Sequence, residues 1–297
     1  MSKTGLPKDA ILIVNGGSRT GADVFDQARE KLVAAGLTLL DCKLVEKPEE
    51  IGDAVADAVK RAPMVILGGG DGSLSSNVEP FLGSDCVLGV LPLGTANSFA
   101  RTLGIPLDVD GAVDVIANGR VETVDVGRIG KTHFLNAAAV GLAPEVAESV
   151  PHGLKRLLGR LGYLIWAGWS ASSFNAFRAV IDDGRREHRF WATELRIGNG
   201  RFHGGVELMP DASPGTGELM VQAVPGRSLV YLGWSYVEAG LKLESRARSV
   251  REFSAKSFKI KTRPPLRVSI DGELGPYTPF EAAVVPQKVK VAAPIEA

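Results

Sequence analysis

Short apolar runs alternate with stretches of helical periodicity along the first part of the chain. Apolar residues recur at helical spacing from Val24 to Ala35, where Gly36 is a typical C-cap, and again over residues 51–62. Runs that we expect to form buried strands lie between these stretches, at residues 10–14, 37–40, 64–67 and 87–91. Strands that alternate with helices predict a parallel sheet with crossover helices.

The pattern changes after about residue 123, where strand-like runs separated by turn residues predominate. These runs lie at residues 132–139, 177–182, 190–197, 219–224, 257–261 and 266–270. Two helical insertions interrupt them, at residues 154–169 and 228–243. We therefore expect an α/β N-terminal domain with a parallel, Rossmann-like sheet, then a mainly antiparallel β-sandwich C-terminal domain with helical insertions. The boundary between them falls near residue 125.

The composition is that of an ordinary globular protein, because 45% of the 297 residues are hydrophobic and 23% are charged. A formal net charge of +0 argues against a chain built to hold nucleic acid. Cys42 and Cys86 make no disulfide framework, which fits a reducing compartment. The first residues lack a signal-peptide pattern, and no apolar run reaches the ~18 residues that span a bilayer. We expect a cytoplasmic protein without a transmembrane segment.

Basic residues accumulate from Lys242 to Arg267, where only Glu244 and Glu252 oppose them. The stretch is either a solvated surface or a region attracted to an anionic membrane, where each basic residue contributes roughly 1 kcal/mol. Aromatic residues do not interleave with these charges, which disfavours nucleic acid.

Glycines follow the third predicted strand directly, as Gly68-Gly69-Gly70-Asp71-Gly72-Ser73. A strand that ends in glycines before a helix exposes backbone N–H groups with no side chains in the way, and such groups attract phosphate. The carboxylate of Asp71 is costly beside phosphate unless a cation or a proton transfer requires it. The loop therefore predicts a nucleotide-phosphate site with chemistry or metal at hand.

A second loop of this kind, containing Gly94, Thr95 and Asn97, follows the fourth predicted strand. Thr95 or Gly94 can cap the helix that comes next, and an amide and hydroxyl corner suits phosphate or ribose. Asn15, Gly16, Gly17 and Ser18 follow the first strand. Because parallel sheets bind ligands at the carboxyl ends of their strands, we expect the three loops to line one crevice.

Other patterns have ordinary interpretations. Residues 125–132 nearly match a P-loop, but Asp125 replaces its first glycine and a strand follows, so we expect a hairpin turn. Asp271-Gly272 after a strand is typical of a turn, and Asn136 and Asn199 suit turns or strand ends. The four histidines lack the spacing of zinc ligands.

At the two glycine-containing loops the chain resembles the diacylglycerol kinase catalytic-domain family, which includes bacterial lipid kinases and sphingosine kinases. Residues 69–73 match the family's G-G-D-G-T, with Ser73 in place of threonine. Residues 94–101 match its G-T-x-N-D-F-A-R, with Ser98 in place of aspartate. Residues 15–18 are similar to the first nucleotide loop, and Asp271-Gly272-Glu273 fits a later block.

The resemblance implies transfer of the γ-phosphoryl group of ATP to a lipid hydroxyl, with ATP and Mg²⁺ as cofactors. By it, Asp271 is the general base and Asp71 lies near the phosphates. The residues implied to bind nucleotide are Asn15, Gly16, Gly17, Ser18, Gly68, Gly69, Gly70, Asp71, Gly72, Ser73, Leu74, Gly94, Thr95 and Asn97. Lipid would enter an apolar cleft between the domains, with residues 154–169 as its wall. The implied domains are residues 1–125, with 283–297 returning to them, and residues 126–282.

One departure concerns a structural magnesium site that the resemblance implies near Pro214-Gly215-Thr216-Gly217. Thr216 stands where the family has its key aspartate, and a hydroxyl is a poor ligand for a hard cation, so we name no metal ligands. Two alternatives stay open: a kinase of a soluble acceptor such as NAD, and an inactive lipid- or nucleotide-binding regulator. The sequence does not identify the lipid, the oligomeric state or a preference between ATP and GTP. A lipid substrate implies that the protein meets it at a membrane surface, which for a cytoplasmic protein is the inner face.

Overall fold

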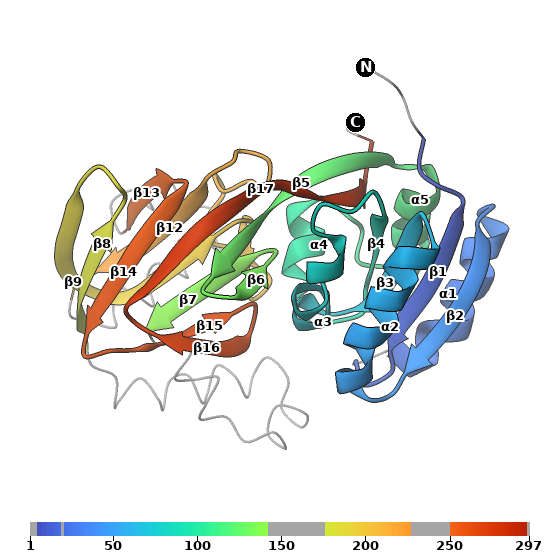
Figure 1. Cartoon of the computed structure of the whole chain (residues 1–297), viewed down its shortest axis with the longest axis horizontal. Coiled ribbons are helices and arrows are strands. Elements are labelled where there is room, and N and C mark those ends of the chain that lie inside the picture. The colour runs from blue at the N-terminus through green and yellow to red at the C-terminus, as the bar shows by residue number, and fades with distance from the viewer. Residues whose placement is uncertain (1–4, 19–20, 142–175, 227–249, 296–297) are drawn as a thin grey trace.

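The computed structural model describes residues 5–18, 21–141, 176–226 and 250–295. These residues form two lobes, one of alternating strands and helices and one of strands (Figure 1). The predicted helices at 154–169 and 228–243, and with them part of the basic stretch from Lys242, lie outside the described residues.

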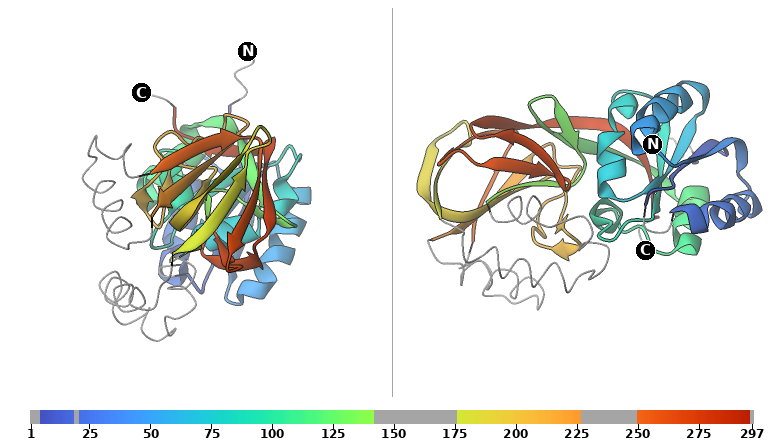
Figure 2. Two further views of the ribbon diagram at one scale, coloured as in Figure 1. Left: turned by 90° about the vertical axis from the view of Figure 1, so that its left-hand side faces the viewer. Right: turned by 90° about the horizontal axis from the view of Figure 1, so that it is seen from below.

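The first lobe contains a parallel sheet with helices on both sides (Figure 2). Its strands are β1 (Asp9–Asn15), β2 (Thr38–Val45), β3 (Met64–Gly69) and β4 (Val87–Pro92), in the order β4-β3-β1-β2. Its helices are α1 (Gly21–Ala34), α2 (Pro48–Arg61), α3 (Asp71–Ser76), α4 (Ser98–Thr102) and α5 (Val109–Asn118), with a 3₁₀ turn η1 (Glu79–Phe81). The predicted strands and the two longer predicted helices are all present.

Sequence signals at the helix ends explain where two of these helices begin. Proline opens α2 at Pro48, where its missing N–H is not needed, and Glu49 and Glu50 follow in the first turn. In α5 the side chain of Asp108 accepts a hydrogen bond from the Gly111 N–H at 2.8 Å. Together with the apolar faces of these helices, the caps fix where each crossover meets the sheet.

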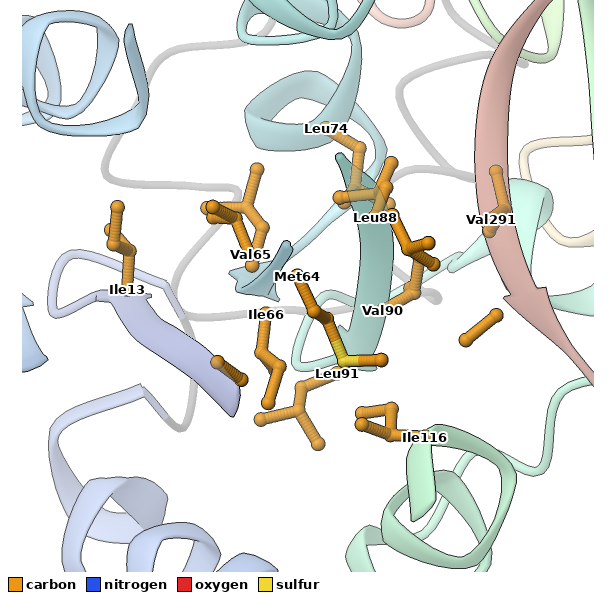
Figure 3. Close-up of a cluster of buried hydrophobic side chains, with 14 of the residues drawn as sticks. Ile13, Met64, Val65, Ile66, Leu74, Leu88, Val90, Leu91, Ile116 and Val291 are labelled. Atoms are coloured by element: carbon orange, nitrogen blue, oxygen red, sulfur yellow. The ribbon is translucent and has the colours of Figure 1, made fainter. Parts of the chain in front are cut away.

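The core of the first lobe lies on both faces of its parallel sheet. β3 and β4 are buried along their whole length, as expected of central parallel strands covered on both sides. Figure 3 shows Ile66 and Val90 of these strands packed with Ile116 of α5. Val291, from the far end of the chain, joins the same cluster.

The second lobe is a sandwich of antiparallel strands, as the sequence predicts. Its strands are β5 (Arg120–Ile129), β6 (Thr132–Phe134), β7 (Ala137–Gly141), β8 (Phe177–Asp182), β9 (Glu187–Gly198), β12 (Leu219–Pro225), β13 (Arg251–Ala255), β14 (Ser257–Arg263), β15 (Arg267–Ile270), β16 (Glu273–Tyr277) and β17 (Phe280–Ala293). A small hairpin, β10 (Phe202–His203) with β11 (Val206–Glu207), lies beside α4. The β5–β6 hairpin places its turn at Gly130-Lys131, so the hairpin predicted at Gly127–Lys131 is present, with residues 127–129 in β5 rather than in the turn.

The second lobe differs from the sequence prediction in one broken strand and in several additional strands. The single strand expected at 132–139 is wrong, because it is broken at Leu135-Asn136 into β6 and β7. The break turns the amides of residues 135–137 toward the Asp271 carboxyl, which lies 134 residues beyond Ala137 along the chain. The additional strands, which were not expected from the sequence, are β5, β10, β11, β13, β16 and β17.

β5 and β17 run side by side from one lobe to the other (Figures 1 and 2). Their pairing shifts register between Val285 and Val289, so the ribbon bends where it passes between the lobes. Beyond the shift, β17 pairs in parallel with β4, through Lys290 with Val87 and Val291 with Leu88. The end of the chain therefore extends the sheet of the first lobe. Among the described residues, no helix is long and apolar enough to cross a membrane.

Candidate functional site

The loops that follow β1, β3 and β4 meet at the carboxyl edge of the parallel sheet. The Asn15 side chain donates to the Ser73 Oγ at 2.8 Å, and the Leu93 N–H donates to the Gly69 carbonyl at 2.9 Å. A Cβ atom on Gly94 would lie 2.5 Å from the Cα of Gly70, so the two glycine backbones touch. The expectation that these loops share one crevice is met.

Asp71 joins two of these loops. Its carboxylate accepts hydrogen bonds from the Ser98 and Phe99 N–H groups, both at 2.9 Å, at the start of α4. The prediction that Thr95 or Gly94 caps this helix is wrong. Asn97 is the N-cap residue, with φ of 48°, and a carboxylate from a different loop satisfies the free amides.

A cleft of about 390 Å³ opens between the loops, and we call it the loop cleft. Its lining residues are Asn15, Ser18, Pro48, Ile51, Gly70, Gly72, Ser73, Ser76, Asn77, Gly94, Thr95 and Glu273. Seven of these were predicted from the sequence: Asn15, Ser18, Gly70, Gly72, Ser73, Gly94 and Thr95. Thr95 is exposed at the rim, while the glycines leave main-chain surface open to a ligand.

The other predicted residues support the cleft without lining it. Gly68 and Gly69 belong to the buried end of β3, and Leu74 packs in the core with 2% of its surface exposed. The Asn97 side chain accepts from the Gly94 N–H at 2.9 Å and donates to the carbonyl of Pro92 at 3.2 Å.

Gly16 and Gly17 shape the first loop in the same supporting way. The Gly16 N–H donates to the Val45 carbonyl at 2.8 Å, and the Gly17 N–H donates to the Asn15 Oδ1 at 2.9 Å. The first loop is thereby tied to β2 and holds the Asn15 side chain toward the cleft.

Asp271 lies at the first position of the tight turn between β15 and β16. Both turn residues have positive φ, 44° at Asp271 and 92° at Gly272, as Asp-Gly hairpins require. The Asp271 N–H donates to the Ala137 carbonyl at 2.9 Å. The turn predicted from the sequence is present, and it fastens this hairpin to the start of β7.

The carboxyl of Asp271 is surrounded by hydrogen-bond donors. Oδ1 accepts from the Ala137 N–H at 2.8 Å, and Oδ2 accepts from the Leu135 and Asn136 N–H groups at 3.0 and 3.3 Å. Oδ2 also accepts from the hydroxyl of Ser75 on α3. Burial raises the pKa of Asp271 to about 6, against the opposing effects of the Ala137 amide and the Ser75 hydroxyl.

A second cavity, of about 300 Å³, lies on the other side of α3, and we call it the base cavity. Its lining residues are Gly72, Ser75, Ser76, Glu79, Lys131, Thr132, His133, Ile270, Glu273, Leu274 and Gly275. It shares Gly72, Ser76 and Glu273 with the loop cleft. The two spaces therefore adjoin. Asp271 is not among the lining residues of either space, but its hydrogen-bond partner Ser75 and its chain neighbour Ile270 line the base cavity.

Charges of both signs line the base cavity. His133 Nδ1 lies 3.9 Å from the Glu79 carboxylate, and burial lowers the pKa of His133. The Ser76 hydroxyl reaches the Glu273 carboxylate at 3.1 Å, which fixes that side chain between the two spaces. The lining is mixed rather than apolar, which suits the polar end of an amphipathic molecule.

Several site residues were not predicted from the sequence. Pro48, Ile51, Ser75 and Ser76 are small or apolar residues of helices, a pattern that indicates packing rather than binding, and Asn77 is the C-cap residue of α3. Glu273 follows the Asp-Gly turn, and its place in the later family block was the available signal. That the helix residues line these spaces is seen only once the helices are packed against the loops.

A buried polar junction lies behind Asp271. The side-chain amide of Asn136 donates to the carbonyl of Phe202. The main-chain carbonyl of Asn136 accepts from the N–H groups of Asn199 and Gly200 at 2.8 and 2.9 Å. The Asn199 side chain donates to the carbonyls of Asp125 and Leu135 at 2.9 and 2.7 Å. The two asparagines thus lie at a strand break and a strand end, and they fix the amides that hold the carboxyl.

The turn around Thr216 uses the threonine hydroxyl internally. The hydroxyl donates to the Ser213 carbonyl at 3.1 Å and accepts from the Glu218 N–H at 3.3 Å. Across the described part of the chain, no group of three or more His, Cys, Asp or Glu side chains is placed to hold a metal ion. We assign no metal ligands.

The sequence matches two family models that together cover most of the chain. Residues 9–129 match the model described as "Diacylglycerol kinase catalytic domain", and residues 136–293 match "YegS C-terminal NAD kinase beta sandwich-like domain". The protein named "Diacylglycerol kinase" in Staphylococcus aureus (strain Newman) is 30% identical over 253 residues, which are 83% of this chain and 80% of that one. A second, from Staphylococcus epidermidis (strain ATCC 12228), is 29% identical over 253 residues, with the same 83% and 80% coverage.

Solved structures share the fold. The crystal structure of a diacylglycerol kinase from Bacillus anthracis str. Sterne superposes with a TM-score of 0.76 and 21% identity, covering 98% of each chain. With kinases as relatives across both domains, the chain is a phosphotransferase of the kinase class. More narrowly, it belongs to the diacylglycerol kinase catalytic-domain family, a family of lipid kinases.

Proposed function

We propose that the chain is an ATP-dependent lipid kinase that transfers the γ-phosphoryl group to a hydroxyl of a diacylglycerol-like or related lipid. The observation that carries this proposal is the arrangement around α3. At its start the helix lines the loop cleft through Gly72 and Ser73, and near its end Ser75 holds the Asp271 carboxyl. One short helix thus adjoins both a candidate phosphate site and a candidate base.

The loop cleft would hold the nucleotide. Polar groups of Asn15, Ser18, Ser73 and Thr95 face it, and at Gly70 and Gly94 no Cβ keeps a phosphate from the main chain. ATP would supply the phosphoryl group and Mg²⁺ would neutralise phosphate charge. Among the described residues that line this cleft, none is lysine or arginine, which supports a need for that cation.

Asp271 would act as the general base. Its pKa of about 6 leaves it ionised at neutral pH yet more basic than an exposed aspartate, which suits it to take a proton from an acceptor hydroxyl. The acceptor's polar end would occupy the base cavity beside it. Asp71 would act from the other side, because its bonds to Ser98 and Phe99 hold the second loop against the glycine loop.

We further propose that residues 1–125 with 283–297 form the nucleotide-binding domain and residues 126–282 the lipid-acceptor domain. The pairing of β17 with β4, and Val291 in the first core, support the return of the chain end. A lipid acceptor implies work at a membrane surface, so we place the protein in the cytoplasm and at the inner face of the membrane. The expected lipid wall at residues 154–169 lies outside the described residues.

A kinase of a soluble acceptor such as NAD is the second candidate. The description of the model matched by residues 136–293, which names an NAD kinase-like sandwich, favours it. The polar lining of the base cavity is compatible with either acceptor.

The test is phosphoryl transfer from radiolabelled ATP, in the presence of Mg²⁺, to dioctanoylglycerol, phosphatidylglycerol, sphingosine or NAD, each assayed separately. We expect a labelled lipid, and about a 10²- to 10⁴-fold loss of kcat in Asp271→Asn. Asp211→Asn, an exposed carboxylate outside both spaces, is the matched control and should keep wild-type activity. Label in NAD alone would favour the second candidate, no label at all would favour an inactive regulator, and an unaffected Asp271→Asn would refute the base.

A further inference from the structure

Asp271 has two kinds of hydrogen-bond partner. The amides of residues 135–137 are held by the β6–β7 break and can only donate. Within the described part of the chain, Ser75 is the one side chain that bonds to this carboxyl. Its hydroxyl is 196 residues away in sequence and reaches Oδ2 from α3.

We infer that Ser75 is a positioning residue for phosphoryl transfer, whose hydroxyl donates to the Asp271 carboxylate, holds it in place and stabilises its charged form. The inference rests on the proposed function, because it assumes that Asp271 accepts a proton. The hydroxyl donates to the carboxylate, and its loss would leave the three backbone amides as the remaining donors to that charge.

The surroundings of Ser75 leave its hydroxyl little choice of partner. Ser75 is 9% exposed, and the Leu135 N–H lies 3.3 Å from its Oγ as well as 3.0 Å from Asp271 Oδ2. Since that amide occupies one acceptor direction of the hydroxyl, the hydroxyl proton is directed to the carboxylate. Ser75 therefore stabilises the charged form of Asp271, which the direction of its effect on the Asp271 pKa also indicates.

Other charges act on the same carboxyl and must be kept constant in a test. Asp71 raises the pKa of Asp271 by charge repulsion. Further titratable or charged groups on the packed elements are Glu79, Lys131, His133 and Glu273, which line the base cavity, Arg267 on β15, and Glu194 and Arg196 on β9. None of them changes in a Ser75 variant, so a shift in the titration of Asp271 would come from the lost hydroxyl.

The experiment compares wild type with Ser75→Ala and Ser75→Thr. The Asp271 carboxyl is titrated directly by NMR on ¹³C-aspartate-labelled protein, with Asp271→Asn to assign the signal. The pH dependence of kcat/KM is measured with dioctanoylglycerol and ATP in the presence of Mg²⁺. In Ser75→Ala we expect the Asp271 midpoint to rise by about one pH unit, as loss of one hydrogen bond to a charge implies. Activity should then fall about fivefold at pH 6 and recover near pH 8, and Ser75→Thr should restore both values.

The matched control is Thr262→Val. Thr262 is also a buried hydroxyl, 6% exposed, that bonds to the Pro264 carbonyl at 2.8 Å and to the Thr278 hydroxyl, and neither partner bonds to the Asp271 carboxyl. Its loss should lower stability without moving the pH profile.

Two failures are distinguishable. If Asp271 titrates alike in wild type and Ser75→Ala, or if Ser75→Ala loses activity equally at every pH, the positioning role is overturned. If the carboxyl titration shifts but wild type phosphorylates no lipid, the proposed function fails, and with it the catalytic meaning of the contact.

Discussion

Replacing Gly94 with alanine should separate the two loops that form the loop cleft. The new Cβ would lie 2.5 Å from the Gly70 Cα and 2.8 Å from the Asn97 Oδ1. Ordinary contact begins at 3.4 Å, so the loops must move apart by about 1 Å. That movement would stretch the 2.9 Å bond from Leu93 N–H to Gly69 O beyond hydrogen-bonding range, and the clash with Asn97 Oδ1 would strain the bond from Gly94 N–H to that atom within the second loop.

The cost follows from these contacts. Overpacking together with weakened backbone bonds should lower the free energy of unfolding by about 2–3 kcal/mol. A phosphate that bonds to both loops would lose geometry by the same 1 Å, for which we expect a roughly 10- to 100-fold weaker Kd for ATP. Denaturant unfolding measures the first quantity and titration calorimetry with ATP and Mg²⁺ the second.

A matched control separates this effect from glycine replacement in general. At Gly215 a Cβ would meet nothing within 4 Å, so Gly215→Ala should leave the Kd for ATP unchanged. Gly94→Ala that binds ATP with the wild-type Kd and unfolds at the wild-type denaturant concentration would refute the contact between the loops as the basis of the cleft.

Three further predictions concern the pH dependence of activity, its requirement for Mg²⁺ and the stability of the core. Activity should rise with pH through about 6, because Asp271 must lose its proton before it can accept one; a flat kcat/KM profile between pH 5 and pH 7 would contradict this. Chelation with EDTA should lower activity at least about 100-fold and added Mg²⁺ should restore it, because phosphoryl transfer needs a cation to neutralise phosphate charge; full activity in EDTA would count against the proposal. Val291→Ala should lower the free energy of unfolding by about 2 kcal/mol, since Val291 is 0% exposed, whereas Val33→Ala, at 56% exposed, should change it by less than about 0.5 kcal/mol in a urea titration.

Local patterns were sufficient for the fold class and for the meeting of the loops. Buried apolar runs define β1, β3 and β4, and their carboxyl ends must lie at one edge of a parallel sheet, so glycines placed there converge. The two positive φ angles of the Asp271-Gly272 turn likewise follow from the dipeptide itself.

Contacts between distant segments could not be predicted in this way. Asp71 binds amides 27 and 28 residues further along, so Asn97 rather than Thr95 precedes α4. The break at Leu135-Asn136 is invisible in an apolar run, because its cause is the Asp271 carboxyl more than 130 residues away. In the sequence Ser75 is an ordinary small residue of a short helix. Its bond to Asp271 is seen only when the second lobe is packed against α3. In each case the partner is set by tertiary packing, which periodicity does not encode.

The strand that closes the first sheet has a consequence for how this protein is made. During synthesis, β1 to β4 leave the ribosome long before Lys290 and Val291. Until those residues follow, β4 is an open edge strand and the core of the first lobe lacks the Val291 side chain. Its folding is completed only after residues 290 and 291 have left the ribosome. A chain cut before residue 286 would contain the sandwich strands up to β16 in full and yet be damaged in the first lobe.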